Sequence, residues 1–208
     1  MPPPEHHEPQ SPEPGNKQDE RSRRTTQRIM AGARRLFAEH GFAGTSAEQI
    51  VAAAGVTRGA LYHHFAGKKG VFRAVVEQIQ AEIDQRVRAA VERVQDPVEM
   101  LIVGNGEFLA ACLDPGARRI LLTEAPAVLG WQKWRAIDEA HVLGKYRAFL
   151  GQLMEKGVLR PLPVDALAHV ISGAANEAAM WAAEANDPDA ALAQAQQIMA
   201  EMIRSFRA

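Results

Sequence analysis

One short segment carries side chains suited to contact with a polyanion. In a helix over residues 58–65, Leu61 and Phe65 lie four residues apart and form its buried side. The opposite side then exposes Thr57, Arg58, Gly59, Tyr62 and His63. An arginine can bind guanine or phosphate, a glycine allows close approach to the bases, and a tyrosine can reach a phosphate. The pattern predicts a helix that reads a groove of duplex DNA; the alternative is an ordinary solvated face.

A second short helix must position this reading helix. Thr45 and Glu48 fit a capping box, which predicts a helix start, and Gly55 suits the left-handed position that ends a helix. Thr57 is then placed to cap the helix over 58–65. Two short helices joined by so tight a turn form a helix-turn-helix.

Basic residues on both sides of the motif extend the predicted contact. Arg24 ends an arginine cluster before a helix that Thr25 or Thr26 is expected to cap, where it would form a flexible arm on the phosphates or minor groove. A solvated basic linker is the alternative. Lys68 opens the next helix, so its ammonium and free backbone N–H groups could meet on one phosphate. The predicted DNA-binding residues are Arg24, Thr45, Thr57, Arg58, Gly59, Tyr62, His63 and Lys68.

The charge distribution supports a local contact with nucleic acid. Residues 21–74 hold ten Lys/Arg and two Asp/Glu, a net charge of +8, so the remainder carries −9 of the chain's total of −1. A cationic head on an acidic body favours phosphate contact at one place over general coating of DNA. Binding should weaken steeply with salt.

The run from Arg24 to Val76 resembles the DNA-binding domain of the tetracycline-repressor (TetR) family. The matching residues are Ala33, Leu36, Phe37, Gly41, Thr45, Ile50, Ala53, Gly55, Val56, Gly59, Leu61, Tyr62, Phe65, Lys68 and Phe72. Beyond Val76 the resemblance is to the family's layout. It implies an all-α fold of about nine helices, with a three-helix DNA-binding domain and a larger helical domain for ligand binding and dimerisation.

Composition and length are those of an ordinary folded protein. The 208 residues are 47% hydrophobic and 24% charged. Residues 1–20 are Pro-rich and acidic, which predicts a disordered tail rather than a secretory signal. No apolar run of 18 residues is present, so no membrane span is expected. The lone Cys112 excludes an intrachain disulfide and agrees with a cytoplasmic location.

The expected domains are a tail over 1–20, a DNA-binding domain over 21–74 and a helical domain over 75–208. A long amphipathic helix starts at Lys68 and stops before Asp96, which caps the next helix. Later helices are expected from residue 115 to about Ala125, from Trp131 to Lys156, from Val164 to Glu184 and from Pro188 to Phe206. No strand-like alternation is found.

The last two predicted helices, Val164 to Glu184 and Pro188 to Phe206, each carry a wide apolar stripe. The resemblance implies that they form a four-helix bundle in a homodimer, which would place two reading helices roughly 34 Å apart along the duplex. The alternative is that the stripes close a monomeric core.

The middle helices are the expected place for a small-molecule effector, as the resemblance implies. Polar groups near aromatic walls give the predicted ligand-binding residues: Phe108, Cys112, Trp134, His141, Asn176 and Trp181. The alternative is core packing. The tryptophans suggest a flat or hydrophobic compound, but its identity does not follow.

The sequence thus predicts a ligand-responsive repressor, in which the ligand tilts the fourth helix and changes the separation of the two heads, so that operator binding is lost. A DNA-binding regulator without a small-molecule ligand, or an activator, is the alternative. Enzymatic interpretations are weak: His63 and His64 point about 100° apart on a helix, Gly67-Lys68 lacks the upstream glycine of a phosphate loop, and a Cys112–His141 pair lacks an orienting partner. No metal or cofactor is expected.

Overall fold

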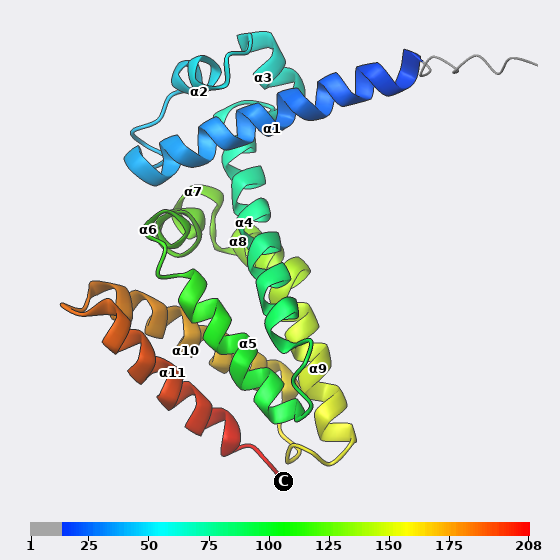
Figure 1. The fold of residues 1–208 in the computed structure, drawn as a ribbon, viewed down its shortest axis with the longest axis vertical. Helices are drawn as coiled ribbons and strands as arrows, with labels where there is room; N and C mark the ends of the chain where they lie inside the picture. Colours follow the sequence, from blue (N-terminus) through cyan, green and yellow to red (C-terminus); the bar gives the residue numbers. More distant parts are fainter. Residues whose placement is uncertain (1–13) are drawn as a thin grey trace, which may run out of the picture.

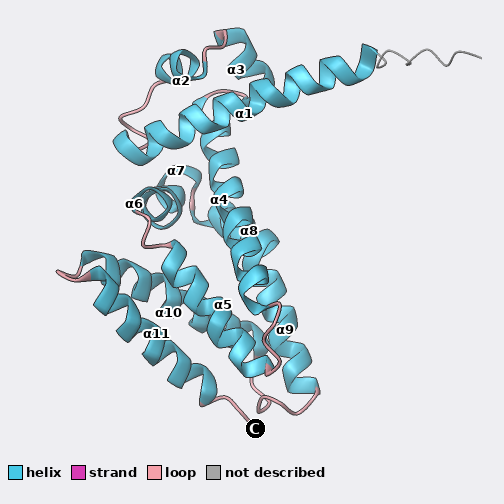
Figure 2. Cartoon of the chain, in the orientation of Figure 1, coloured by secondary structure: helices cyan, strands magenta, loops and turns pink. Residues whose placement is uncertain are grey.

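The computed structural model describes residues 14–208, which fold almost entirely into helices (Figures 1 and 2). The elements are α1 (Pro14–His40), α2 (Ala47–Ala54), α3 (Arg58–Phe65), α4 (Lys68–Val91), α5 (Pro97–Ala111), α6 (Pro115–Arg118), the π-helix η1 (Arg119–Glu124), α7 (Ala125–Leu129), α8 (Trp131–Asp138), the π-helix η2 (Glu139–Leu143), α9 (Gly144–Glu155), α10 (Val164–Glu184) and α11 (Pro188–Arg204). Because α6–η1–α7 and α8–η2–α9 are each continuous, these residues form nine helices. The predicted all-α class is confirmed.

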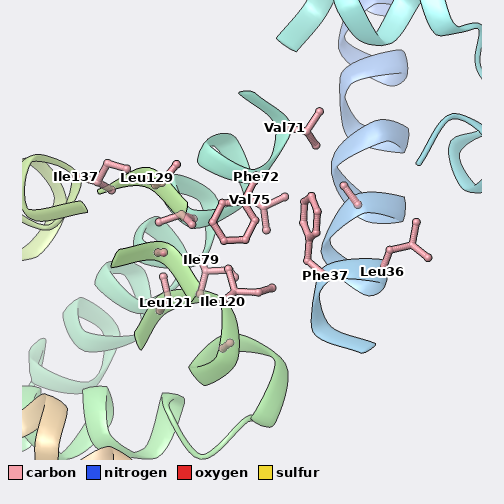
Figure 3. Close-up of a cluster of buried hydrophobic side chains, with 14 of the residues drawn as sticks. Leu36, Phe37, Val71, Phe72, Val75, Ile79, Ile120, Leu121, Leu129 and Ile137 are labelled. Carbon is pink, nitrogen blue, oxygen red and sulfur yellow. The ribbon is translucent and has the colours of Figure 1, made fainter. Parts of the chain in front are cut away.

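The first three helices form a head against the start of α4. Phe37 on α1 packs edge-to-face on Phe72 of α4, with ring centroids 5.1 Å apart, and Phe42 packs on Phe72 at the same distance. Figure 3 shows this cluster continuing from α4 to Ile120 of η1 and Leu129 of α7. The head is therefore joined to the body through one apolar core as well as through α4.

The two short helices have the predicted order, but α2 has a different cap. Ser46 is its N-cap, and Gln49 completes the capping box. The predicted pair of Thr45 and Glu48 is wrong by one residue, because Thr45 is buried and its hydroxyl donates to the carbonyl oxygens of the preceding turn. Gly55 ends α2 with φ of 58°, as expected.

The start of α1 also differs from the prediction. The helix begins at Pro14, so Thr25 and Thr26 lie inside it and cap nothing. The Thr25 hydroxyl donates to the Arg21 carbonyl oxygen one turn earlier, at 2.9 Å, which leaves the helix intact. Residues 14–20 of the predicted disordered tail are thus helical, whereas residues 1–13 lie outside the described part of the chain.

Two later helices run through π-turns that the sequence pattern did not indicate. Pro126 was expected to end the helix near Ala125, yet the helix continues to Leu129. Pro126 directly follows the π-turn of η1, where the regular α-helical hydrogen-bond pattern is already interrupted. The helix predicted over Trp131–Lys156 is present, but η2 interrupts its α-geometry.

The body is arranged around α5, which lies between α4 on one side and the α10–α11 pair on the other (Figure 1). Asp96 caps α5 by accepting from Val98 N and Glu99 N, with Pro97 at the first helical position, as predicted. A second apolar core fills this layer with Leu101, Leu109, Leu150, Ile171, Met199 and Ile203. Among the described residues, no helix is long and apolar enough to span a membrane.

Candidate nucleic-acid interface and internal cavity

The outer face of α3 has the composition that the sequence predicted. The Arg58 side chain is 68% exposed and Tyr62 is 47% exposed, while Leu61 is fully buried beneath them. The Arg58 guanidinium lies 5.6 Å from the centre of the Tyr62 ring. A Cβ at Gly59 would meet only Thr57 Oγ1, at 3.9 Å, so this part of the helix is open to close approach.

The other two predicted residues of this helix have different local roles. Thr57 is the N-cap of α3, and its hydroxyl accepts a hydrogen bond from Ala60 N at 3.2 Å. His63 is exposed, and its ring packs against His64 with centroids 5.2 Å apart. Arg58 also pairs with Glu48 of α2 at 3.3 Å, a surface pair that a phosphate could displace.

Thr45 and Lys68 occupy positions that contradict a direct role on DNA. Thr45 is 1% exposed and its hydroxyl donates to Leu36 O and Gly41 O. The Lys68 ammonium donates to Phe42 O at 2.9 Å and Thr45 O at 2.8 Å, and lies 4.1 Å above the Phe42 ring. Both side chains fix the turn before α2 instead of facing outward.

A row of arginines on α1 lies beside the short helices. Arg24 is exposed and pairs weakly with Glu20 at 3.7 Å, so it stands on a helix and not on a flexible arm. Arg21, Arg24, Arg28 and Arg35 recur at helical spacing on one face of α1. Arg28 donates to Gly55 O at 2.9 Å, which brings this row next to the turn between α2 and α3.

An ion pair on η1 holds the head to the body, and the sequence interpretation missed it. Glu124 accepts from Phe42 N at 2.7 Å and from Arg119 Nε at 3.1 Å. Arg119 also donates to the carbonyl oxygens of Ala38 and Glu39 at the end of α1. No local motif marks this contact, because its partners are about 80 residues apart in the sequence.

A cavity of about 440 Å³ lies in the body between α4, α5, η2, α9 and α10, and it is partly open to solvent. Its wall is mainly apolar, and Phe108 and Asn176 of the predicted ligand-binding set line it. The size is within the usual range for a small-molecule site, roughly 300–1,000 Å³.

The other four predicted ligand-binding residues do not line this cavity. Cys112 is fully buried in the second core, where burial raises the pKa of its thiol to about 12, despite Arg118 and Arg86. Trp134 is packed in the first core and Trp181 is 49% exposed on α10. His141 is on η2, where Val142 and Leu143 line the cavity instead.

The ionised groups at the cavity are already paired. Burial raises the pKa of Asp138, and the Arg135 guanidinium 3.1 Å away opposes that shift. Burial by itself would raise the pKa of Asp84. Hydrogen bonds from Lys145 and Arg88 outweigh this effect and hold the pKa of Asp84 below its usual range. No cluster of three metal-ligating side chains occurs within residues 14–208.

Two family models match the chain. Residues 29–75 match a model described as bacterial regulatory proteins, tetR family, and residues 98–206 match a tetracyclin repressor-like C-terminal domain. The Transposon Tn10 TetC protein of Escherichia coli is 27% identical over 158 residues, which cover 76% of this chain and 80% of that protein. The HTH-type transcriptional repressor AcnR of Corynebacterium efficiens is 41% identical over 61 residues, covering 29% of this chain and 32% of the repressor.

Solved structures with this fold are also similar. A TetR-family transcriptional regulator from Pectobacterium atrosepticum is 36% identical, with a TM-score of 0.74, and the match covers 91% of this chain and 97% of that chain. A second neighbour from Syntrophomonas wolfei has a TM-score of 0.76 at 18% identity over 88% of this chain and 96% of its own, and this likeness shows the fold alone.

Proposed function

Because the chain belongs to the TetR family of DNA-binding transcriptional regulators, which are not enzymes, we propose that it is a repressor released from its operator by a small molecule. One observation carries the proposal: α4 begins under the DNA-reading head and its other end forms a wall of the cavity. Phe72 belongs to the core beneath the head, and Ile83, Val87 and Val91 line the cavity. A bacterial repressor of this kind would act in the cytoplasm.

Operator recognition is assigned to α3 and to the arginine row of α1. Arg58 and Tyr62 supply the base or phosphate contacts, Thr57 and His63 flank them, and Gly59 leaves room for the bases. Arg24 supplies a phosphate contact from α1. The high density of positive charge over residues 21–74 would steer the head to the duplex.

Substitution of the two central side chains tests this assignment. Arg58→Ala and Tyr62→Ala should each weaken binding to a fragment of the protein's own promoter by about 5- to 150-fold, which corresponds to roughly 1–3 kcal/mol. Arg93→Ala, an exposed arginine outside the head, is the matched control and should bind like the parent protein. Unchanged affinity in both test variants, measured by fluorescence anisotropy, would exclude α3 as the reading helix.

We propose a homodimer through α10 and α11. Both helices already bury one apolar side in the second core, yet they also expose large apolar residues: Val170 is 60% exposed, Trp181 49% and Ile198 69%. An exposed apolar surface of this kind favours a partner, and a twofold pair of heads would fit two half-sites of an operator.

The association state tests the dimer directly. Sedimentation should give twice the monomer mass of 22.7 kDa. Ile198→Asp should shift the protein toward monomers and weaken operator binding, because burying an unpaired carboxylate is unfavourable. Gln152→Asp, at an exposed polar position on α9 outside the proposed interface, is the control. If the unsubstituted protein sediments with the monomer mass, the alternative is favoured, in which the apolar stripes of α10 and α11 only close the core of a single chain.

The proposed switch uses the shared helix α4. A ligand in the cavity would favour a tilted α4, and this would change the separation of the two heads. A coupling of roughly 1–3 kcal/mol, or 5- to 150-fold in operator affinity, is usual for such systems. A library of small molecules that stabilised the protein thermally without changing operator affinity would support a regulator without an inducer. A reporter gene that falls silent when the protein is deleted would support an activator.

A further inference from the structure

We infer that the cavity takes an uncharged, mainly apolar molecule that carries a hydrogen-bond acceptor for the Tyr146 hydroxyl. This inference rests on the proposed function, because it names the class of effector for that same cavity. Three features of the cavity wall lead to it: an apolar side, a fixed neutral donor and ionic groups that are already paired within the protein.

The apolar side comes mainly from α4 and two aromatic rings. Ile83, Val87 and Val91 recur at spacings of four on α4 and line the cavity. Phe108 of α5 and Phe149 of α9 face the same space. A ligand that fills about 440 Å³ against such a wall gains most of its affinity from burial of its own apolar surface.

The fixed donor is the Tyr146 hydroxyl. Asn105 uses its amide N–H groups on Leu101 O, at 2.8 Å, and on the Tyr146 hydroxyl oxygen, at 3.2 Å. The tyrosine oxygen is therefore an acceptor in this pair, and within residues 14–208 its own O–H has no acceptor. Burial raises the pKa of Tyr146 to about 12, although the bond from Asn105 opposes that shift, so the hydroxyl keeps its proton at neutral pH.

Neutral polar groups on α10 complete this side of the cavity. Ser172 and Asn176 are one helical turn apart and both line the wall. Together with Asn105 and Tyr146 they can bind a hydroxyl, carbonyl or ether group without any full charge. Such a set orients a ligand, whereas the apolar side supplies affinity.

Ionic groups at the cavity have partners within the protein. Asp138 pairs with Arg135, so a cation would have to break that pair to be neutralised. At the α4–α9 side, Asp84 lies between Lys145, at 2.8 Å, and Arg88, at 3.0 Å, which leaves one net positive charge there. That charge repels cations. It is shared by the Lys145 and Arg88 side chains, which are 49% and 65% exposed, so water screens it from an anion in the cavity. Burying an unpaired ion is costly, so an uncharged molecule is favoured.

Matched probes with one skeleton and three charges test the inference by isothermal titration calorimetry. One set is 1-hydroxypyrene, pyrene-1-carboxylate and (pyren-1-ylmethyl)trimethylammonium; the other is 1-decanol, decanoate and decyltrimethylammonium. In at least one set the neutral probe should bind at least tenfold more tightly than both ions. Tighter binding of an ion in both sets, or no binding of either neutral probe, would overturn the inference.

A tyrosine substitution tests the donor. Tyr146→Phe should weaken binding of the neutral probe five- to tenfold, whereas binding of the hydrocarbon without the hydroxyl group, pyrene or decane, should be unchanged. If the neutral probe binds the variant and the unsubstituted protein equally well, the donor role is refuted. Intact binding of the parent hydrocarbon also shows that the cavity has kept its shape. Thr123→Val, which removes an exposed hydroxyl on η1 outside the cavity, is the matched control and should bind every probe like the unsubstituted protein.

Operator affinity separates this inference from the proposed function. If an ion binds most tightly and releases operator DNA, the repressor function stands and the ligand class is wrong. If the neutral probe binds through Tyr146 but operator affinity is unchanged, the ligand class stands and release by a small molecule fails.

Discussion

Lys68 gives the sharpest test of the head structure, because sequence and structure assign it different roles. Its ammonium donates to Phe42 O and Thr45 O and lies over the Phe42 ring. A hydrogen bond from a charged donor contributes about 1.5–3 kcal/mol and a cation–π contact about 0.5–1 kcal/mol. Since the site is only part-buried, water can replace some of these contacts. We expect Lys68→Met, which keeps the side-chain stem, to lower the free energy of unfolding by about 2–3 kcal/mol.

This loss should be measurable by calorimetry and by urea unfolding. For a chain of this size, about 2–3 kcal/mol corresponds to a decrease in Tm of roughly 4–12 °C. Lys69→Met is the matched control: Lys69 is the exposed neighbour, and its substitution should change stability by no more than about 0.5 kcal/mol.

The salt dependence of operator binding decides between the two roles. A lysine that neutralises a phosphate contributes about 0.9 to the slope of log affinity against log salt. At temperatures where the variant is folded, Lys68→Met should keep the slope of the parent protein. A slope reduced by about 0.9 together with an unchanged Tm would refute the structural role and restore the phosphate contact.

Three further predictions follow from buried or crowded groups. Native Cys112 should resist iodoacetamide at pH 8, because a pKa of about 12 leaves roughly one thiol in ten thousand ionised, whereas the unfolded chain should react fully. The lowered pKa of Asp84 stabilises the fold at pH values above the ordinary carboxyl pKa, and this stabilisation is lost as the pH falls through the lowered pKa. In urea titrations, Asp84→Asn should therefore be less stable than the unsubstituted protein at pH 7, and its stability should fall less below about pH 4. Gly70→Ala should destabilise the head by more than about 2 kcal/mol in thermal unfolding, since its Cβ would lie 1.5 Å from Phe65 O, whereas Gly151→Ala, with open space, should stabilise α9 by about 0.5–1 kcal/mol.

Local signals predicted the reading pair well. Gly55 ends α2 in the left-handed conformation, and Thr57 caps α3, because both effects depend on the backbone within three residues. The exposed set on α3 followed from helical periodicity once Leu61 was assigned to the core. The same reasoning failed at Thr45, where two candidate hydroxyl caps are adjacent and the buried position of one made Ser46 the cap.

The cavity was predictable only in part. Phe108 and Asn176 line it, but Trp134 and Cys112 are enclosed in the two cores, and Tyr146 was not among the predicted residues. Apolar or aromatic residues at helical spacing have the same pattern whether they face a neighbour or an empty space. On η2, Val142 and Leu143 line the cavity, whereas the predicted His141 does not.

The amino-acid sequence by itself determined the helical order, the caps at Gly55, Thr57 and Asp96, and the outward face of α3, because these arise from neighbours along the chain. Tertiary structure alone decided that Lys68 is used on two carbonyl oxygens, that Tyr146 keeps a free donor and that Glu124 holds Phe42 from 82 residues away. The reason is physical: a polar side chain's function depends on which groups are left to bond with it, and those groups come from helices that only folding brings together.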